Sequence, residues 1–465
     1  MQFRPDSESL PGEADNATPL PAGGVRARFA SLLRIGSHGQ LIGHNIGFLL
    51  GDRVVRLAVG LFVNAWLVRY LGPDRMGLMS FAQSLVLIAA VASQLGLETI
   101  VVRDLVRRPE EERDLLGTAL FLRLAGMLLT VGVALGAASL LRPGDHESWR
   151  LTLVFTAVAL GQVFDIVDYW FQSRAEIGPV VVARGVAFAA GSAAKIVVIL
   201  MHAPLVAVAA VIAGEYVLSA ATLVVAYAAR GRSPLAWRWV PARGLALLRD
   251  SWPLVLNSVA IVISVRVDQM LLTTLRGTHE NGLYAAAQRL TEIVYYVPVA
   301  VMTAANPILL RSHQRDRGEY ERRLQRLFTL LARSGLGIAL VLSLGTHWVV
   351  RMLFGERFAS TAPVLSLLVW AAPMMFLGVA QTNWFVAENR QRGLMLRSAV
   401  AAVLSVLLNL WLVPRLGARG AATSFLVSQA LAYLALNACF RETRPLFRMQ
   451  CRALMPWPAP RGGAR

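Results

Sequence analysis

The fold is decided by a nine-residue stretch that occurs twice in the chain. It reads Gly77-Leu78-Met79-Ser80-Phe81-Ala82-Gln83-Ser84-Leu85 and returns as Gly282-Leu283-Tyr284-Ala285-Ala286-Ala287-Gln288-Arg289-Leu290. Glycine, leucine, alanine, glutamine and leucine hold the same places in both copies, 205 residues apart. The same offset pairs Gly72 with Gly277, and polar Asp52 and Asn64 with polar Asn257 and Gln269. The sequence therefore predicts two related structural repeats.

The composition outside the repeat is that of a membrane protein. Apolar residues make up 56% of the 465 positions and charged residues only 16%, whereas soluble domains carry about 25% charged residues. Twelve apolar stretches are each long enough to cross a hydrocarbon core of about 30 Å. They lie at 46–68, 77–102, 115–141, 149–172, 179–201, 204–228, 251–275, 282–310, 325–346, 358–386, 394–413 and 420–440. We expect an all-α polytopic protein of about twelve transmembrane helices.

Six spans separate the two copies of the repeat, so both halves should cross the membrane in the same direction, as parallel repeats. The predicted organisation is a basic tail (1–45), a six-helix lobe (46–228), a linker (229–250), a second six-helix lobe (251–440) and a C-terminal tail (441–465). Arginines concentrate in alternate loops, near Arg107, Arg238 and Arg317. The positive-inside rule then makes both termini cytoplasmic. The net charge of +18 thus reflects topology and attraction to anionic lipids, and we expect no nucleic-acid partner.

Several classes of enzyme are excluded by what the chain lacks. Its one lysine, Lys195, does not stand in a phosphate-binding Gly-Lys-Ser/Thr motif, which excludes ATP-driven transport within this chain. There is no HExxH motif, and Cys439 and Cys451 are too few for a structural zinc site. We therefore expect neither a metal nor a cofactor, and no catalytic residue.

Charges inside predicted spans are the best guide to mechanism, because a charge near the bilayer centre costs at least about 2.5–3.5 kcal/mol. The first span carries Asp52, Arg53 and Arg56. Asp52 and Arg56 share a helix face, and Arg56 should lie about 15 Å deep. Two interpretations remain open: a self-neutralising pair that anchors the lobes, or a cationic lining for an anionic lipid pyrophosphate.

A second group of charges falls on the seventh and eighth spans. Arg266 and Asp268 are about 200° apart on one helix and should face different environments. Asp268 and Arg289 have equal depth on consecutive antiparallel helices, which predicts an ion pair that Glu292, one turn deeper, would share. The alternative is an ion- or proton-coupling site.

A third group combines acids of the fourth span with the lone lysine. Asp165 and Asp168 are three residues apart, a spacing that paired catalytic carboxylates also use, but no domain is present to hold an acceptor. We expect one of them to neutralise Lys195 of the fifth span. Glu98 and Glu215 are further acids without an assigned partner.

Four motifs carry a family resemblance. Residues 70–105, with Val102-Arg103-Asp104-Leu105 at their end, resemble the second-helix signature of Wzx-type oligosaccharide flippases. Asp168-Tyr169-Trp170-Phe171-Gln172 is similar to the exit of that family's fourth helix, and Arg266-Val267-Asp268-Gln269 to its seventh helix. Leu408-Asn409-Leu410-Trp411-Leu412-Val413-Pro414-Arg415-Leu416-Gly417-Ala418-Arg419-Gly420-Ala421-Ala422 resembles its eleventh-helix turn. The resemblance covers about residues 50–440.

The resemblance implies the MOP-superfamily fold of MATE exporters and MurJ-type flippases, with two lobes forming a V around a central cavity. It implies translocation of polyprenyl-pyrophosphate-linked oligosaccharides across a bacterial inner membrane for O-antigen, capsule or exopolysaccharide synthesis, with a polysaccharide polymerase and glycosyltransferases as partners. It places helices one, two, seven and eight around the cavity, which makes Arg53, Arg56, Arg266 and Arg289 the candidate cations, with Lys195 in reserve. A MATE-type cation or drug antiporter and a membrane-embedded glycan polymerase or ligase remain the alternatives.

The topology predicts where reporter fusions fall. Fusions after Arg107, Arg238, Arg317 and the C-terminus should read cytoplasmic, and fusions after Pro73 or Arg276 periplasmic, because arginine-rich loops stay inside. Paired alkaline phosphatase and green fluorescent protein reporters measure both sides. An outward C-terminus would mean an odd number of spans and contradict the parallel repeats.

Overall fold

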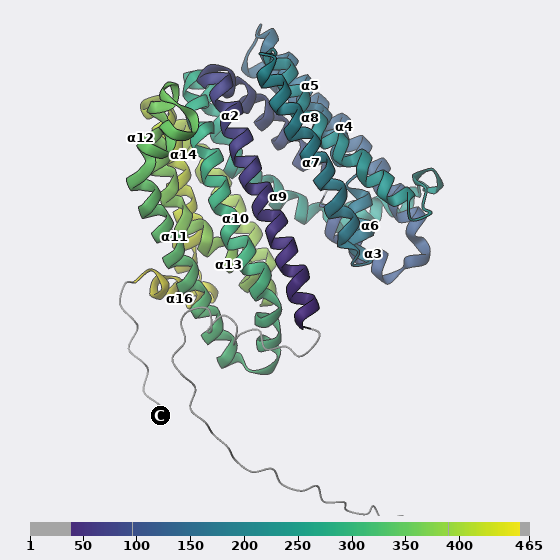
Figure 1. Cartoon of the computed structure of the whole chain (residues 1–465). Coiled ribbons are helices and arrows are strands. Elements are labelled where there is room, and N and C mark those ends of the chain that lie inside the picture. Colours follow the sequence, from purple (N-terminus) through teal and green to yellow (C-terminus); the bar gives the residue numbers. More distant parts are fainter. Residues whose placement is uncertain (1–38, 95, 389, 456–465) are drawn as a thin grey trace, which may run out of the picture. The chain divides into compact units, whose positions relative to one another are not determined.

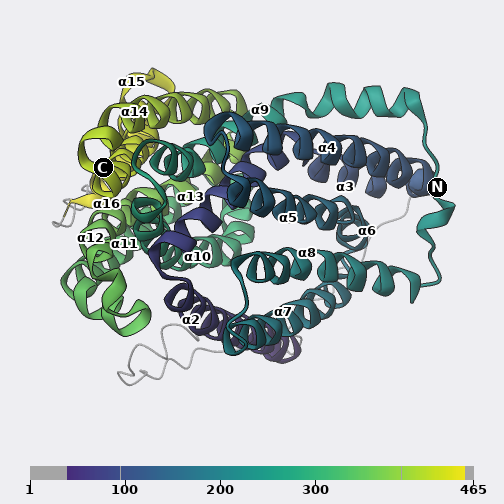
Figure 2. The same cartoon turned by 90° about the horizontal axis from the view of Figure 1, so that it is seen from above.

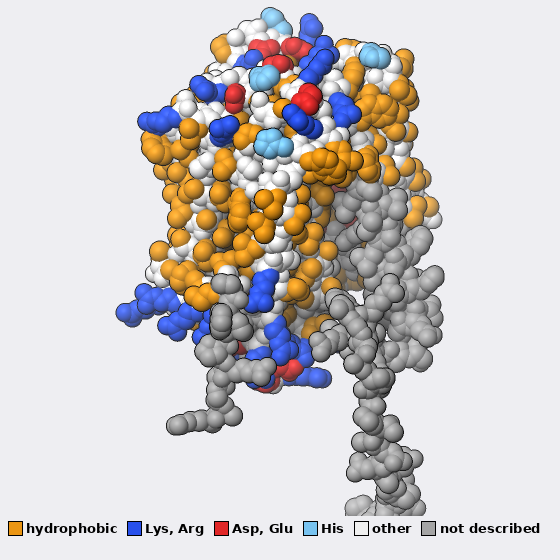
Figure 3. Space-filling view, turned by 60° about the vertical axis from the view of Figure 1, so that its left-hand side comes forward, with side chains coloured by type: hydrophobic (Ala, Val, Ile, Leu, Met, Phe, Trp, Pro, Cys, Tyr) orange, Lys and Arg blue, Asp and Glu red, His pale blue; other side chains and the backbone are white. Residues whose placement is uncertain are grey.

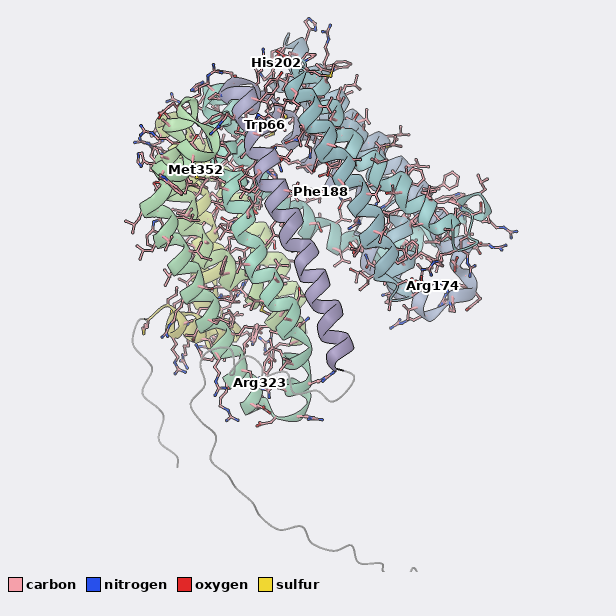
Figure 4. The ribbon with its side chains drawn as sticks, viewed as in Figure 1. Trp66, Arg174, Phe188, His202, Arg323 and Met352 are labelled. Atoms are coloured by element: carbon pink, nitrogen blue, oxygen red, sulfur yellow. The ribbon has the colours of Figure 1, made fainter. Side chains whose placement is uncertain are left out.

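The computed structural model describes residues 39–94, 96–388 and 390–455, with most side chains placed from Val59 onward. Within these ranges the chain is helical and contains no strand. The helices run up and down between two ends (Figure 1). Trp66, His202 and Met352 lie toward one end, called here the upper end, and Arg174 and Arg323 toward the other, the arginine-rich end (Figure 4).

Seven helices form the first half. They are α2 (Gly39–Gln94), α3 (Leu97–Arg107), α4 (Glu112–Leu141), α5 (His146–Val163), α6 (Ile166–Ser173), α7 (Ile177–Leu200) and α8 (Leu205–Ala228). Seen from above, α4, α5, α7 and α8 lie together on one side (Figure 2). We call α3–α8 the first bundle.

The remaining helices form the second bundle, most of which lies on the other side in the same view, while the start of α9 extends beside α4 (Figure 2). They are α9 (Pro241–Arg276), α10 (Thr278–Arg315), α11 (Arg317–Phe354), α12 (Ala362–Leu368), α13 (Ala372–Ala387), α14 (Gln391–Ala430), α15 (Leu436–Cys439) and α16 (Arg444–Leu454). The most extensive packing in this bundle joins α9 to α14.

Each of the twelve predicted spans lies mainly on helix in the described part of the chain. Nine helical stretches of the described residues are long and apolar enough to cross a membrane. Two of these stretches hold more than one pass, because α2 turns at Gly72 and α14 at Gly417. Helix α10, which contains the predicted span 282–310, is not among the nine. The prediction of an all-α polytopic protein is confirmed.

The surface has an apolar middle zone between two charged ends. Apolar side chains form a broad band, and charged side chains gather at the two ends beyond it, with arginines prominent below (Figure 3). A band of exposed apolar side chains is stable only against lipid, so the band marks the bilayer-facing surface.

The two turns at the upper end use glycine at repeat-equivalent positions. Gly72 and Gly277 both have positive φ angles, 71° and 94°, with extended ψ. A side chain at either position would be strained, so glycine is required where one pass ends and the next begins. The pairing of these glycines by the 205-residue offset is therefore matched in backbone conformation.

The two repeats meet through a reciprocal contact between α2 and α10. A Cβ atom on Gly77 would lie 1.8 Å from the carbonyl oxygen of Thr278, and one on Gly282 would lie 1.8 Å from that of Pro73. Pro73 and Thr278 are themselves separated by the same offset. The side chain of Asn281 donates a 2.8 Å hydrogen bond to the Gly77 carbonyl. The repeated glycines let the two backbones touch at a pseudo-twofold axis.

Helix α9 contacts both bundles. Near its start, Arg243 lies 2.6 Å from Glu111 and Asp250 lies 3.4 Å from Arg103, both partners belonging to the first bundle. Further along, α9 packs on α14, where the Ser405 hydroxyl donates to the Ser264 carbonyl at 3.3 Å. One continuous helix therefore joins the bundles at the arginine-rich end.

Some helix limits differ from the expectation. Helix α9 begins at Pro241, inside the predicted linker 229–250, and the predicted tail 441–465 contains helix α16. The fourth span is interrupted at Phe164 and Asp165, so Asp165 stands in a turn between α5 and α6 rather than inside one helix. The lobe boundaries themselves remain predictions, and residues 1–38 lie outside the described part.

The reciprocal contact predicts that alanine destabilises the protein at Gly77 and Gly282 but not at a glycine with open space around it. Gly77→Ala and Gly282→Ala each force a methyl group against a carbonyl oxygen, at a cost beyond the roughly 1–3 kcal/mol of ordinary overpacking. Gly132→Ala in α4 meets no atom within 4 Å and should be neutral or stabilising, because alanine favours helix by up to about 1 kcal/mol. Thermal unfolding of the detergent-purified proteins compares the three. Equal melting temperatures would contradict the contact.

Candidate functional site

A cavity of about 280 Å³ lies between the two bundles. Its wall comes from α2, α5, α7, α8, α9 and α10. Most of the lining is polar: Asn64, Ser80, Gln83, Lys195, Glu215, Tyr216, Arg266, Gln269, Gln288, Arg289 and Glu292. At 1.5 Å per residue, Arg289 lies about 16 Å along α10 from the upper end, which places the cavity near the middle of the bilayer.

The first bundle supplies one ion pair to this cavity. Lys195 Nζ of α7 lies 2.7 Å from Glu215 Oε2 of α8, and Lys195 is only 8% exposed. Gly191, one turn before Lys195, makes the approach of α8 possible, because a Cβ there would lie 2.6 Å from the Glu215 carboxylate. Pairing offsets the cost of holding both charges away from bulk water.

The second bundle supplies an excess of positive charge. Arg266 of α9 lies 2.9 Å from Glu292 of α10. Arg289 donates a 3.2 Å hydrogen bond to the side-chain oxygen of Gln83 in α2. Within the described residues no carboxylate lies within ion-pair distance of Arg289. The described lining residues thus include three cationic and two anionic side chains, and Arg289 is the cation among them with no described carboxylate at ion-pair distance.

Side-chain amides connect the two repeats across the cavity wall. Ser84 donates a 2.7 Å hydrogen bond to Gln269, whose amide donates to Gln288, which in turn donates to the Val265 carbonyl at 3.3 Å. Each amide has both donor and acceptor atoms, so this row can exchange partners with a hydroxyl-rich ligand.

The lining follows the internal repeat. Asn64 and Gln269 are equivalent by the 205-residue offset, as are Gln83 and Gln288, and all four line the cavity. The charged positions break the symmetry, since Leu87 corresponds to Glu292. Likewise, Leu61 and Ser84 correspond to Arg266 and Arg289. The amides are shared by both repeats, whereas these three charges belong to the second alone.

The predicted Asp268–Arg289 ion pair is wrong. Asp268 is 1% exposed, does not line the cavity and accepts a hydrogen bond from the Tyr284 hydroxyl and another, 2.8 Å long, from the Gln269 backbone N–H. Equal depth brought the two residues to the same level but not to the same face. The prediction that Arg266 and Asp268 face different environments is confirmed, and Glu292 partners Arg266 instead.

The predicted neutralisation of Lys195 by Asp165 or Asp168 is also wrong. Arg184 of α7 lies 2.7 Å from Asp168 and 3.6 Å from Asp165, and Arg123 lies 3.9 Å from Asp165. These acids lie toward the arginine-rich end of the first bundle, away from the cavity lining. Arg184 stands three helical turns before Lys195 on the same helix, so it is Arg184 that reaches them.

The structure therefore brings together Lys195, Arg266, Arg289 and Glu292 of the candidate site and leaves out Asp165, Asp168 and Asp268. The side chains of Asp52, Arg53 and Arg56 lie outside the described part, and their roles stay predictions. Sequence reasoning missed Glu215 as the partner of Lys195. It also missed Asn64, Gln83, Gln269 and Gln288 as lining residues, although the repeat offset had already paired them.

Two models of known protein families match the sequence. A family model described as "Polysaccharide biosynthesis protein" matches residues 42–313, more than half of the chain, and the MatE model matches residues 253–411. The chain belongs to the polysaccharide biosynthesis protein family. No curated protein matches the sequence.

Solved structures similar to this family member share its fold at low identity. The lipid II flippase MurJ, in an inward closed conformation, aligns with a TM-score of 0.68 at 10% identity, covering 87% of this chain and 90% of that one. An inward-facing multidrug resistance MATE transporter of the MOP superfamily aligns with a TM-score of 0.66 at 14% identity, covering 85% and 96%.

A further MOP superfamily transporter, from Pyrococcus furiosus, is described as having a binding pocket of reverse polarity. It aligns with a TM-score of 0.60 at 15% identity, covering 86% of this chain and 94% of that one. The protein is thus a multi-pass membrane protein with the fold of MOP-superfamily transporters and flippases.

The pairing of Lys195 with Glu215 predicts a rescue by double substitution. Lys195→Met leaves Glu215 without its partner, and breaking a buried pair costs up to about 3–5 kcal/mol, less where water reaches the acid. Lys195→Met with Glu215→Gln should recover most of that loss. Thermal unfolding and membrane abundance measure both. Lys195→Met with Asp168→Asn is the matched control and should recover nothing.

Proposed function

We propose that this protein translocates polyprenyl-pyrophosphate-linked oligosaccharides from the inner to the outer leaflet of a bacterial inner membrane, for cell-surface polysaccharide synthesis. The observation that carries the proposal is Arg289, a half-buried guanidinium at mid-membrane depth that lines the cavity and has an amide, not a described carboxylate, as its partner. Such a cation is costly to keep there unless an anion arrives to share the site.

A pyrophosphate fits this charge arrangement. The planar guanidinium presents paired N–H donors that match phosphate oxygens, and Arg289 can offer them by giving up only a neutral hydrogen bond to Gln83. Arg266 lies 2.9 Å from Glu292, so a phosphate that enters the cavity would compete with this carboxylate for Arg266. Binding by exchange of partners is strong enough to hold a headgroup and weak enough to release it.

The amide row suits the sugar attached to the pyrophosphate. Gln83, Gln269 and Gln288 carry donors and acceptors in alternation, and sugar hydroxyls use both. Because Gln269 and Gln288 already bond each other, a sugar can replace that hydrogen bond without leaving buried groups unsatisfied. The lining thus favours an oligosaccharide diphosphate over an apolar drug.

Alternating access follows from the two repeats. The upper contact between α2 and α10 joins the two repeats, and the Arg289–Gln83 hydrogen bond also crosses between them, about two helical turns away. A phosphate bound to Arg289 would release Gln83 and so loosen that link when the cargo is in place. We further propose that both termini are cytoplasmic and that glycosyltransferases and a polysaccharide polymerase act before and after this step.

A cation or drug antiporter is the competing proposal, since the MATE fold is shared. Export of a cation calls for an acid free to receive it. Glu215 and Glu292, the acidic side chains among the described lining residues, are both paired with cationic side chains. The excess of positive charge therefore favours an anionic cargo.

The decisive variant is Arg289→Ala. Loss of charged hydrogen bonds worth about 1.5–3 kcal/mol each should lower the translocation rate at least tenfold. Arg289→Lys should retain part of the rate, because an ammonium keeps the charge without the fork. The assay uses proteoliposomes containing fluorescent undecaprenyl-pyrophosphate oligosaccharide and follows its exposure to an external quencher. Arg311→Ala, an exposed position on the same helix, is the control.

The results separate the two proposals. A folded Arg289→Ala protein that translocates the lipid at the normal rate would overturn the role of Arg289. Proteoliposomes that move ethidium against a proton or sodium gradient, and leave the labelled lipid in its original leaflet, would establish the antiporter instead.

A further inference from the structure

Helix α16 carries a row of exposed arginines, of which Arg444 also donates a 3.4 Å hydrogen bond to the Ala438 carbonyl. Arg444, Arg448 and Arg452 are four residues apart and all exposed. At 100° per residue they fall within about 80° of one another, on the face opposite the buried residues Leu446, Gln450 and Ala453. Within the described residues no carboxylate lies within ion-pair distance of any of the three, and nearby Glu442 is held by Arg390 at 2.6 Å.

The row is held in place by the opposite face of the helix. Leu446 and Ala453 pack with Leu324 and Phe328 of α11 in one apolar core. Gln450 belongs to a buried amide cluster with Gln381 and Asn437, whose contacts measure 2.7–2.9 Å. Because these contacts fix the helix, the arginines form a constant surface rather than a chance grouping on a loose tail.

The position of α16 points to the membrane surface. The last membrane pass runs from the kink at Gly417 to Cys439, about 33 Å at 1.5 Å per residue, which is one bilayer core. Helix α16 follows within a few residues and lies across the direction of α11 (Figure 1). It therefore stands at the depth of lipid headgroups at the arginine-rich end.

Exposed apolar side chains lie at both ends of the row. Phe440, just before α16, is 43% exposed, and Met455, just after it, is 58% exposed. A soluble phosphate or an acidic protein surface gives these side chains no reason to be exposed, whereas the boundary between headgroups and acyl chains accommodates them.

We infer that α16 is a docking surface for anionic phospholipid headgroups, with Arg444, Arg448 and Arg452 contacting lipid phosphates and Phe440 and Met455 entering the interface. The surface is separate from the central cavity and does not depend on the proposed cargo. It would bind the second bundle to the lipid layer at the arginine-rich end.

The test is photo-crosslinking in nanodiscs of phosphatidylcholine with phosphatidylglycerol that carries a headgroup diazirine, with labelled sites mapped by mass spectrometry. The intact chain should label between residues 440 and 455, and added salt should weaken the labelling. The triple change Arg444→Gln, Arg448→Gln and Arg452→Gln should lower it by up to about fivefold for each arginine. The same three positions changed to lysine should keep it.

The matched control changes Arg150, Arg357 and Arg419 to glutamine, three exposed arginines at the upper end with the same loss of charge. It should leave labelling of α16 intact. Equal labelling by a phosphatidylcholine probe, no loss in a glutamine variant with normal melting temperature, or no response of the intact chain to salt would each overturn the inference. Complete competition by soluble inorganic pyrophosphate would show a free-phosphate site instead.

Discussion

The contact between Gly77 of α2 and Gly282 of α10 is the constraint on which the rest of the structure depends. Each glycine faces a carbonyl oxygen of the other repeat at a distance that no side chain permits. Helices held this closely at one end must separate along their length when their flanking residues are larger. The space between them is filled by polar side chains from both repeats, beginning with Gln83 and Arg289, which stand about two turns beyond the glycines. The position of the cavity thus follows from the close backbone contact that Gly77 and Gly282 permit.

The same arrangement explains why the cavity can hold charge at all. Lys195 and Arg266 each have a carboxylate on the neighbouring helix, and Arg289 shares an amide across the repeats. Partners of this kind offset most of the cost of removing charges from water. Among the described lining residues, those of the second repeat carry a net positive charge and those of the first are neutral overall. An anion that enters the cavity is therefore attracted chiefly to the lining formed by α9 and α10.

Local pattern was sufficient for the fold but not for the pairing within the site. The lengths of the apolar stretches predicted the helices, and the repeat at 205 residues predicted the equivalence of Gly72 with Gly277 and of Asn64 with Gln269. The partners of Asp268 and Lys195 were predicted wrongly, because depth along a helix is readable from sequence whereas the facing of two helices depends on packing. Asp268 contacts Tyr284 rather than Arg289, and Lys195 contacts Glu215 rather than Asp165 or Asp168. Helix α16 was not predicted, because its residues were assigned to the C-terminal tail 441–465.

The ion pairs of helix α9 indicate how much free energy the proposed rocking of the two bundles requires. Its first turns hold the first bundle through Arg103–Asp250 and Arg243–Glu111, and separation at that end must break both pairs. Partly exposed ion pairs contribute only about 0–1 kcal/mol each, whereas inverting a population from 1:99 to 99:1 takes about 5.5 kcal/mol. These two ion pairs therefore stabilise the contact between α9 and the first bundle only weakly. In the proposed alternating access, a cargo with a modest preference for one conformer would therefore shift the equilibrium, by an amount set by how differently the two conformers bind it.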